Sequence, residues 1–194
     1  MNSYLSGVLA VMHCVLLLAA ASAAPWRALL AVPVRLHLLF ASVLALTLTW
    51  ALTGNEWSVL GLASVTLLLG APLALIVGTA AECVVAMLGD VPVRMLLTAA
   101  WVDVAIPVTV TVLLLRAATL WRPGHRRVYT LLAAGVGGML SRLAQLLAFS
   151  AIATLQLPPE TMLLMVLAEG LVNAAIIAIL SACRPQWLQT LSEP

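Results

Sequence analysis

Long apolar runs, separated by short stretches rich in Arg, Pro and Gly, dominate the pattern of this chain. A helix needs about 20 apolar residues to cross the hydrocarbon core of a bilayer. The runs predict segments at about 5–24, 34–53, 57–70, 72–88, 93–115, 128–155 and 161–183. The pattern therefore predicts an all-α fold, a polytopic membrane helical bundle of six to seven transmembrane segments. Residues 1–194 then form a single integral membrane domain in contact with the lipid bilayer.

The apolar stretch 57–88 is too long for a single crossing. As one straight helix it would measure roughly 48 Å, against a hydrocarbon core of about 30 Å. Pro72 follows Gly70 and Ala71 inside this stretch, and a proline breaks the hydrogen-bond ladder of a helix. We therefore expect two pieces, 57–70 and 72–88. The first piece is short, so it is either re-entrant or packed wholly within protein.

Charge is scarce in this chain and unevenly placed. Only 8% of the residues are charged, against about 25% in an ordinary soluble domain. This composition excludes a soluble enzyme and a nucleic-acid binder. If 57–88 crosses twice, the Arg-rich loops all fall on one side: Arg27 and Arg35, Arg116 to Arg127, and Arg184. Because Lys and Arg stay on the cytoplasmic side, we predict an N-terminus outside and a cytoplasmic C-terminus.

Two other features bear on the class of protein. The sequence Ala-Ser-Ala-Ala before Pro25 is similar to a signal-peptide cleavage site, but no positive residue precedes the first run, which is long enough to span. No phosphate-binding loop, zinc-protease motif or Ser/His/Asp arrangement is present. We therefore predict that the chain is not an enzyme.

Four ionisable residues fall at membrane depth: Glu82, Asp103, Arg142 and Glu169. A charge at the centre of a spanning helix costs about 2.5–3.5 kcal/mol on insertion scales, so such residues usually face the bundle interior and pair. Three acids cannot all pair with one Arg. Three interpretations stay open: Arg142 clamps helices together while the acids are satisfied locally, the group moves or senses a cation, or one or more of these residues lie nearer a membrane interface.

His13 and small residues in the segment 128–155 are further candidates. A lone His on an apolar helix is more often a hydrogen-bonding residue than a ligand, so His13 is a weaker candidate ligand. Residue pairs four apart, Ala133 with Gly137 and Ala134 with Gly138, allow close approach of another helix.

Three stretches of the chain resemble one known family. They are 33–38 (Pro-Val-Arg-Leu-His-Leu), the segment from Leu60-Gly61 to Leu69-Gly70-Ala71-Pro72-Leu73, and Ala168-Glu169-Gly170 with the later Arg184-Pro185-Gln186-Trp187. In order and spacing they resemble the substrate-capture permease subunit of energy-coupling-factor ABC transporters of the cobalt/nickel type. The resemblance extends from about Pro25 to the end of the chain.

This resemblance implies an importer of cobalt or nickel in the bacterial inner (plasma) membrane. It implies as partners a membrane coupling subunit and cytoplasmic ATPase subunits. It also implies a metal site made by the N-terminal amine, a His at position 2 and a His at the start of the third segment. The matching positions here are Met1, Asn2 and Ser58, so both His ligands are replaced. Asn and Ser are weaker ligands than imidazole for these ions.

Two alternatives follow from these substitutions. One is a non-transporting accessory or assembly subunit of another membrane complex, favoured by the missing His pair and by the small-residue helix faces. The other is a haem- or copper-handling membrane protein that uses His13 and His37, although the sequence contains no paired-His geometry.

Overall fold

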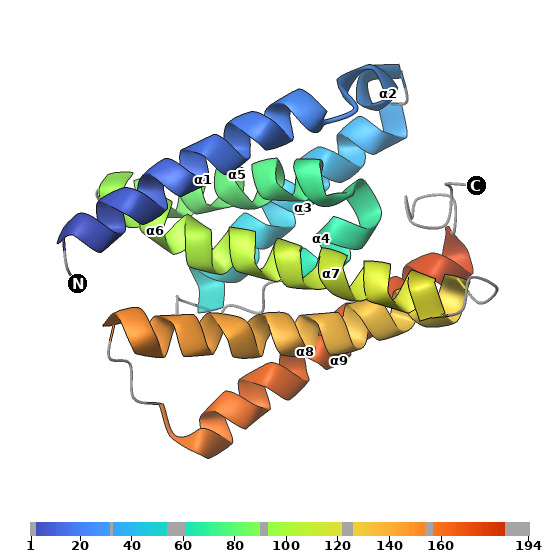
Figure 1. The fold of residues 1–194 in the computed structure, drawn as a ribbon. Coiled ribbons are helices and arrows are strands. Elements are labelled where there is room, and N and C mark those ends of the chain that lie inside the picture. Colours follow the sequence, from blue (N-terminus) through green and yellow to red (C-terminus); the bar gives the residue numbers. More distant parts are fainter. Residues whose placement is uncertain are drawn as a thin grey trace.

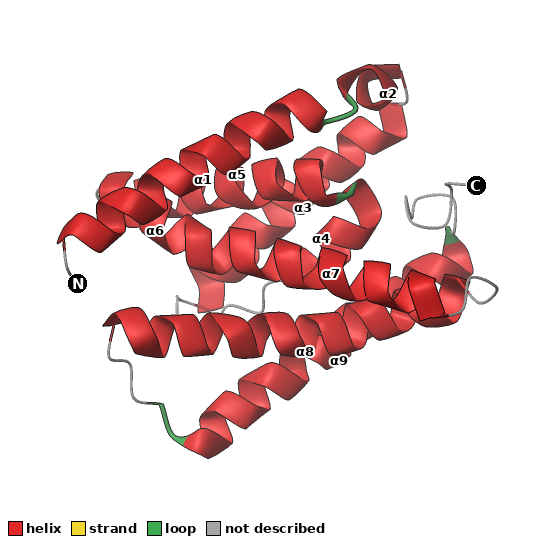
Figure 2. Cartoon of the chain, in the orientation of Figure 1, coloured by secondary structure: helices red, strands yellow, loops and turns green. Residues whose placement is uncertain are grey.

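Helices make up nearly all of the chain that the structure describes. The structure is a computed structural model, and it describes residues 3–31, 33–53, 61–89, 93–121, 126–153 and 157–184. Within these ranges there is no strand, and the helices pack together in one bundle (Figures 1 and 2). In chain order they are α1 (Ser3–Ala23), α2 (Trp26–Ala31), α3 (Pro33–Thr53), α4 (Leu62–Leu69), α5 (Ala71–Leu88), α6 (Val93–Ala100), the π-helix η1 (Trp101–Ala105), α7 (Ile106–Trp121), α8 (Arg126–Ala153) and α9 (Pro159–Cys183).

The predicted helical membrane bundle is confirmed. In the described part of the chain, six stretches of helix are long and apolar enough to cross a membrane. They correspond to six of the seven predicted segments, with ends that differ by a few residues: Tyr4–Ala23, Pro33–Leu52, Ala71–Leu88, Met95–Ala118, Leu131–Ala151 and Pro159–Cys183. The segment predicted at 93–115 consists of three consecutive elements, α6, η1 and α7.

The segment predicted at 57–70 contains no helix long enough to cross by itself. Its described part is α4, whose eight residues make about 12 Å of helix. All of these residues except Leu68 are buried, so α4 packs within protein. The chain then turns at Gly70, where φ is 80° and ψ is 163°, a conformation essentially restricted to glycine. Pro72 falls in the first turn of α5, where a missing N–H is tolerated.

Most of the Arg residues lie at one end of the bundle, and the N-terminal end of α1 lies at the other. In Figure 1, α2, the beginning of α3, the end of α7, the beginning of α8 and the end of α9 lie at one end of the bundle. These elements carry Arg27, Arg35, Arg116, Arg126 and Arg127, and Arg184 directly follows α9. We call this the basic end; Arg122 lies outside the described residues. The beginnings of α1 and α6 lie at the opposite end, so Arg94 is an exception. Which end faces the cytoplasm stays a prediction.

Glycines allow α8 and α9 to approach closely. A Cβ atom on Gly170 of α9 would lie 2.4 Å from Met139 Cγ and 2.7 Å from the carbonyl oxygen of Gly135. A Cβ on Gly138 would lie 3.2 Å from the carbonyl oxygen of Glu169. The small residues predicted to admit a neighbouring helix therefore do so, and the neighbour is α9. Gly137 faces Thr111 and Leu114 of α7 instead.

Candidate functional site

The four ionisable residues predicted at membrane depth lie near one another, with Glu82 close to Asp103, and with Asp103 and Glu169 both close enough to act on the charge of Arg142. Glu82 comes from α5, Asp103 from η1, Arg142 from α8 and Glu169 from α9. Gln145, one turn after Arg142, joins Arg142 to Asp103. Arg142 and Glu169 are fully buried, and Glu82 and Asp103 are half-buried. We call this group, with Asn173, the polar network.

Asp103 lies in a turn of π-helix that interrupts the α-helical geometry. Pro107 has no N–H, so the α-helical hydrogen bond to the carbonyl of Asp103, four residues earlier, cannot form. The chain responds with the π-helix η1, in which the N–H of Ile106 donates to the carbonyl of Trp101, five residues back. Single π turns inside α-helices occur frequently at functional sites. The proline in the sequence thus explains why the helix is irregular at the one acid of this segment.

The carboxyl group of Glu82 lies near that of Asp103, close enough for the two groups to interact electrostatically. Two ionised carboxylates that lie near each other repel in a medium of low dielectric constant. A proton or another cation between the two acids would relieve this repulsion.

Gln145 connects this pair to Arg142 in a fixed orientation. Arg142 Nη1 donates to Gln145 Oε1 at 2.8 Å. Because a guanidinium only donates, the amide oxygen must face Arg142 and the amide nitrogen must face Asp103. Gln145 Nε2 accordingly donates to Asp103 Oδ1. Arg142 Nη2 lies 3.6 Å from Met165 Sδ on α9, and the charges of Glu169 and Asp103 both act on Arg142.

Glu169 and Asn173 connect α9 to the beginning of α4. The backbone N–H of Gly61 donates to Glu169 Oε1 at 3.1 Å. The N–H of Ser64 and its hydroxyl donate to Asn173 Oδ1 at 2.9 and 2.6 Å. Asn173 Nδ2 in turn donates to Glu169 Oε1 at 2.6 Å. A carboxylate thus lies where the first N–H groups of a helix leave partial positive charge, which is a favourable place for it.

The arrangement of these residues can be compared with the first two interpretations left open by the sequence, and the role of the group in handling a cation stays a prediction. Arg142 does connect helices, because it contacts Gln145 on its own helix and Met165 on α9. Glu169 is satisfied by neighbours, as the first interpretation requires. Glu82 and Asp103, however, form an acid pair that the single guanidinium does not neutralise in full. That surplus is the feature of the second interpretation.

Sequence reasoning missed the neutral members of the network. Gln145 and Asn173 are both completely buried. Their signal was spacing, because Gln145 follows Arg142 by three residues and Asn173 follows Glu169 by four, which places each pair on one face of its helix. The π-helix was also missed, although Pro107 so close after Asp103 was a usable sign.

His13 is a buried hydrogen-bonding residue in the structure. The hydroxyl of Thr79 donates its hydrogen to the carbonyl of Leu75 at 2.8 Å. His13 Nε2, 3.0 Å from the same hydroxyl oxygen, must therefore be the donor in that pair. The ring also packs edge-on against Trp101, with centroids 6.5 Å apart. His13 Nδ1 is buried and has no partner among the described residues. His37 is exposed, and its Nδ1 lies 2.8 Å from the carbonyl oxygen of Pro33.

The metal positions implied by the resemblance cannot be placed. Met1, Asn2 and Ser58 all lie outside the described residues. In the part of the chain that the structure covers, no group of three or more His, Cys, Asp or Glu side chains is arranged to hold a metal ion. The polar network therefore differs from a closed metal cage, and it offers carboxyl oxygens together with an amide.

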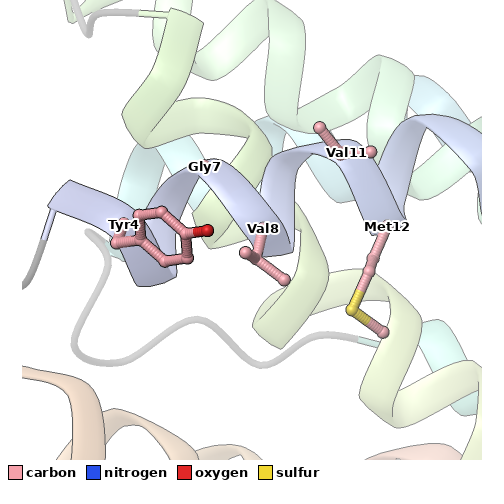
Figure 3. A pocket seen from close by; sticks show the side chains of 5 residues that line it. All are labelled: Tyr4, Gly7, Val8, Val11 and Met12. Carbon is pink, nitrogen blue, oxygen red and sulfur yellow. The ribbon is translucent and has the colours of Figure 1, made fainter.

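A hollow of about 450 Å³ lies on α1, away from the residues of the polar network (Figure 3). Its described lining is almost wholly apolar: Tyr4, Gly7, Val8, Val11 and Met12. Tyr4 and Val11 are largely exposed, as expected for a helix that borders lipid. The described residues of its lining bring no group of convergent polar atoms together, as a site for a polar substrate would need.

Comparison with known proteins gives no relative of this chain. No family model matches it, and no curated protein or solved structure matches it either.

Proposed function

We propose that the protein is a permease subunit that captures a cation in the membrane for an importer of the energy-coupling-factor type. The observation that carries this proposal is the half-buried Glu82–Asp103 pair, whose Asp103 is linked through Gln145 to the buried Arg142. Ionisable residues inside a membrane are expensive and face cavities or ion pathways when they are kept. A carboxyl pair with a surplus of negative charge suits a cation or a proton.

The interrupted helix α4–α5 supports the same proposal. Secondary transporters place their substrate and ion sites where spanning helices are broken, because free backbone groups and helix ends are available there. Here α4 begins beside Glu169 and Asn173, and it ends at the Gly70 turn. The network thus lies at the broken helix rather than at an uninterrupted helix pair.

Cobalt or nickel is the proposed substrate on the basis of the sequence resemblance. In this scheme a membrane coupling subunit and two cytoplasmic ATPase subunits drive import. The amine of Met1 and the amide of Asn2 would contribute to metal capture. The basic end of the bundle would face the cytoplasm, since Arg is retained on that side.

Accumulation of cobalt and nickel tests this proposal. Cells that express the chain with an energy-coupling module should accumulate more of at least one metal than cells without the chain. The N-terminus must be native and untagged, because a tag would block the Met1 amine. Unchanged accumulation of both metals would remove the metal-import version of the proposal.

The accessory-subunit alternative gains no support from the small-residue helix faces. Gly135, Gly138 and Gly170 are used inside the bundle by the packing of α8 against α9, so they are not a free face for a partner helix. Purification in mild detergent separates the two functions. Recovery of a large complex without an ATPase would favour the accessory role.

A further inference from the structure

Arg27 and Arg35 are two cations at the corner between α2 and α3 for which the described residues provide no partner. Arg27 is exposed on α2, and Arg35 is half-buried in the first turn of α3. Neither makes a hydrogen bond or an ion pair with any residue that the structure describes. By contrast, Arg116, Arg142 and Arg184 all have interactions. Among the described residues, nothing neutralises these two guanidinium groups at the basic end of the bundle.

The α2 corner is held firmly enough to present a defined surface. Trp26 Nε1 donates to the carbonyl of Ala21 at 2.7 Å, which ties α2 to the end of α1. The N–H of Leu29 donates to the carbonyl of Pro25 at 2.9 Å, and the Leu29 side chain is buried in the core. The opposite side of α2 is open, with Leu30 71% exposed. Arg27 therefore projects from an anchored helix.

The surroundings of these two cations match the boundary between lipid headgroups and acyl chains. Figure 1 places α2 and the beginning of α3 at one end of the bundle. We expect helices that span the membrane to leave the hydrocarbon at such an end. Exposed Trp26 and Leu30 lie on the same short helix as Arg27. Tryptophan and aliphatic side chains occupy that boundary, while Arg reaches the headgroup phosphates.

Charge complementarity identifies the occupant. The described residues at the basic end include no acid, so nothing in the described part of this end neutralises Arg27 and Arg35. Every basic residue in the chain is Arg rather than Lys. A guanidinium binds phosphate oxygens with two parallel hydrogen bonds, which an ammonium group cannot do.

We propose that the α2–α3 corner binds the headgroup of an anionic phospholipid, with its phosphate between Arg27 and Arg35 and its acyl chains beside Trp26 and Leu30. This contact is independent of the substrate and of the proposed import role. It attaches the basic end of the bundle to the anionic leaflet and stabilises the corner that joins α1 to α3.

Native mass spectrometry in mixed micelles tests this binding, with phosphatidylglycerol titrated against phosphatidylcholine. The wild type should retain phosphatidylglycerol preferentially. R27Q and R35Q should each weaken that retention about fivefold, the effect expected when each Arg contributes about 1 kcal/mol near an anionic surface. R27K, which keeps the charge, should lose less than R27Q and shows that the corner still folds.

R94Q is the matched control, because Arg94 lies in the first turn of α6 at the opposite end of the bundle and its substitution removes the same charge. It should leave retention of phosphatidylglycerol unchanged. Equal loss in R94Q and R27Q, or no preference for phosphatidylglycerol in the wild type, would overturn the proposal. Competition by inorganic phosphate at matched concentration would show a site for free anions and would contradict the lipid assignment. Displacement of the lipid by an acidic partner protein would also contradict it.

Discussion

Ser64 makes two hydrogen bonds to the side-chain oxygen of Asn173, 109 residues away in the sequence, in the core of the bundle. The N–H and the hydroxyl of Ser64 both donate to Asn173 Oδ1, at 2.9 and 2.6 Å. Because the backbone N–H of Ser64 only donates, the Asn173 amide is oriented with its nitrogen toward Glu169. One neutral side chain thus fixes the beginning of α4 and the carboxylate of the polar network together.

Replacing Asn173 should destabilise the protein. N173A leaves the N–H of Ser64 and Glu169 Oε1 without one buried partner each, a cost of about 1–3 kcal/mol per unsatisfied group before any rearrangement. The free energy of unfolding in detergent, from chemical or thermal unfolding, measures this loss. S150A is a suitable control, since the Ser150 hydroxyl contacts only its own helix and is exposed. Equal stability of N173A and S150A would contradict the role of Asn173.

The two glycines that flank α4 should respond differently to substitution. Gly61 has φ 54° and ψ 4°, close to the left-handed helical region that other residues enter at a modest cost. Gly70 has φ 80° and ψ 163°, which is essentially a glycine-only region. G70A should therefore lower the unfolding free energy by about 1–3 kcal/mol, and G61A by less. The same unfolding assay decides the order, and a larger loss in G61A would show that the turn at Gly70 is wrongly described.

Gly170 should tolerate no side chain. A Cβ there would lie 2.4 Å from Met139 Cγ and 2.7 Å from the backbone oxygen of Gly135, so α8 and α9 would have to separate. We expect G170A to cost about 1–3 kcal/mol of stability, as overpacking of a dense core does. G7A is the control, because its Cβ would meet nothing within 4 Å. Shortening Met139 in addition should restore only part of the loss, since the Gly135 oxygen remains.

Gln145 and Asp103 should be energetically linked. Q145L removes the donor to Asp103 and the acceptor for Arg142, while D103N removes the charge that the amide nitrogen faces. If the contact exists, the stability losses of the two variants will not add. A double-mutant cycle with Q145L, D103N and the double variant should give an interaction energy of about 0.5–3 kcal/mol. Strict additivity would argue against the contact.

Hydropathy and proline placement were sufficient to predict most of the fold. The six crossing helices and the break before Pro72 follow from the length of the apolar runs and the missing N–H of proline. Small residues predicted a close helix contact, but which helix it involved depended on packing between α8 and α9. The sequence of a single helix does not specify which other helix packs against it.

The charged residues of the candidate site could be predicted from the sequence, but the hydrogen bonds that link them could not. Glu82, Asp103, Arg142 and Glu169 stood out because a charge is costly in hydrocarbon. Gln145 and Asn173 carry no charge, so the same argument overlooked them, although they set the orientation of the network. His13 was correctly considered a hydrogen-bonding residue, and its partner Thr79 became visible only when α1 and α5 were placed together.

Cation uptake by variants of the acid pair tests the central claim most directly. E82Q and D103N keep the size of each side chain and remove its charge, and E160Q removes an exposed acid from the first turn of α9. In vesicles or cells where the wild type takes up cobalt or nickel, E82Q and D103N should reduce uptake at least tenfold while they remain folded and inserted. E160Q should transport like the wild type. Wild-type uptake by folded E82Q and D103N would contradict the assignment of the polar network as the functional centre.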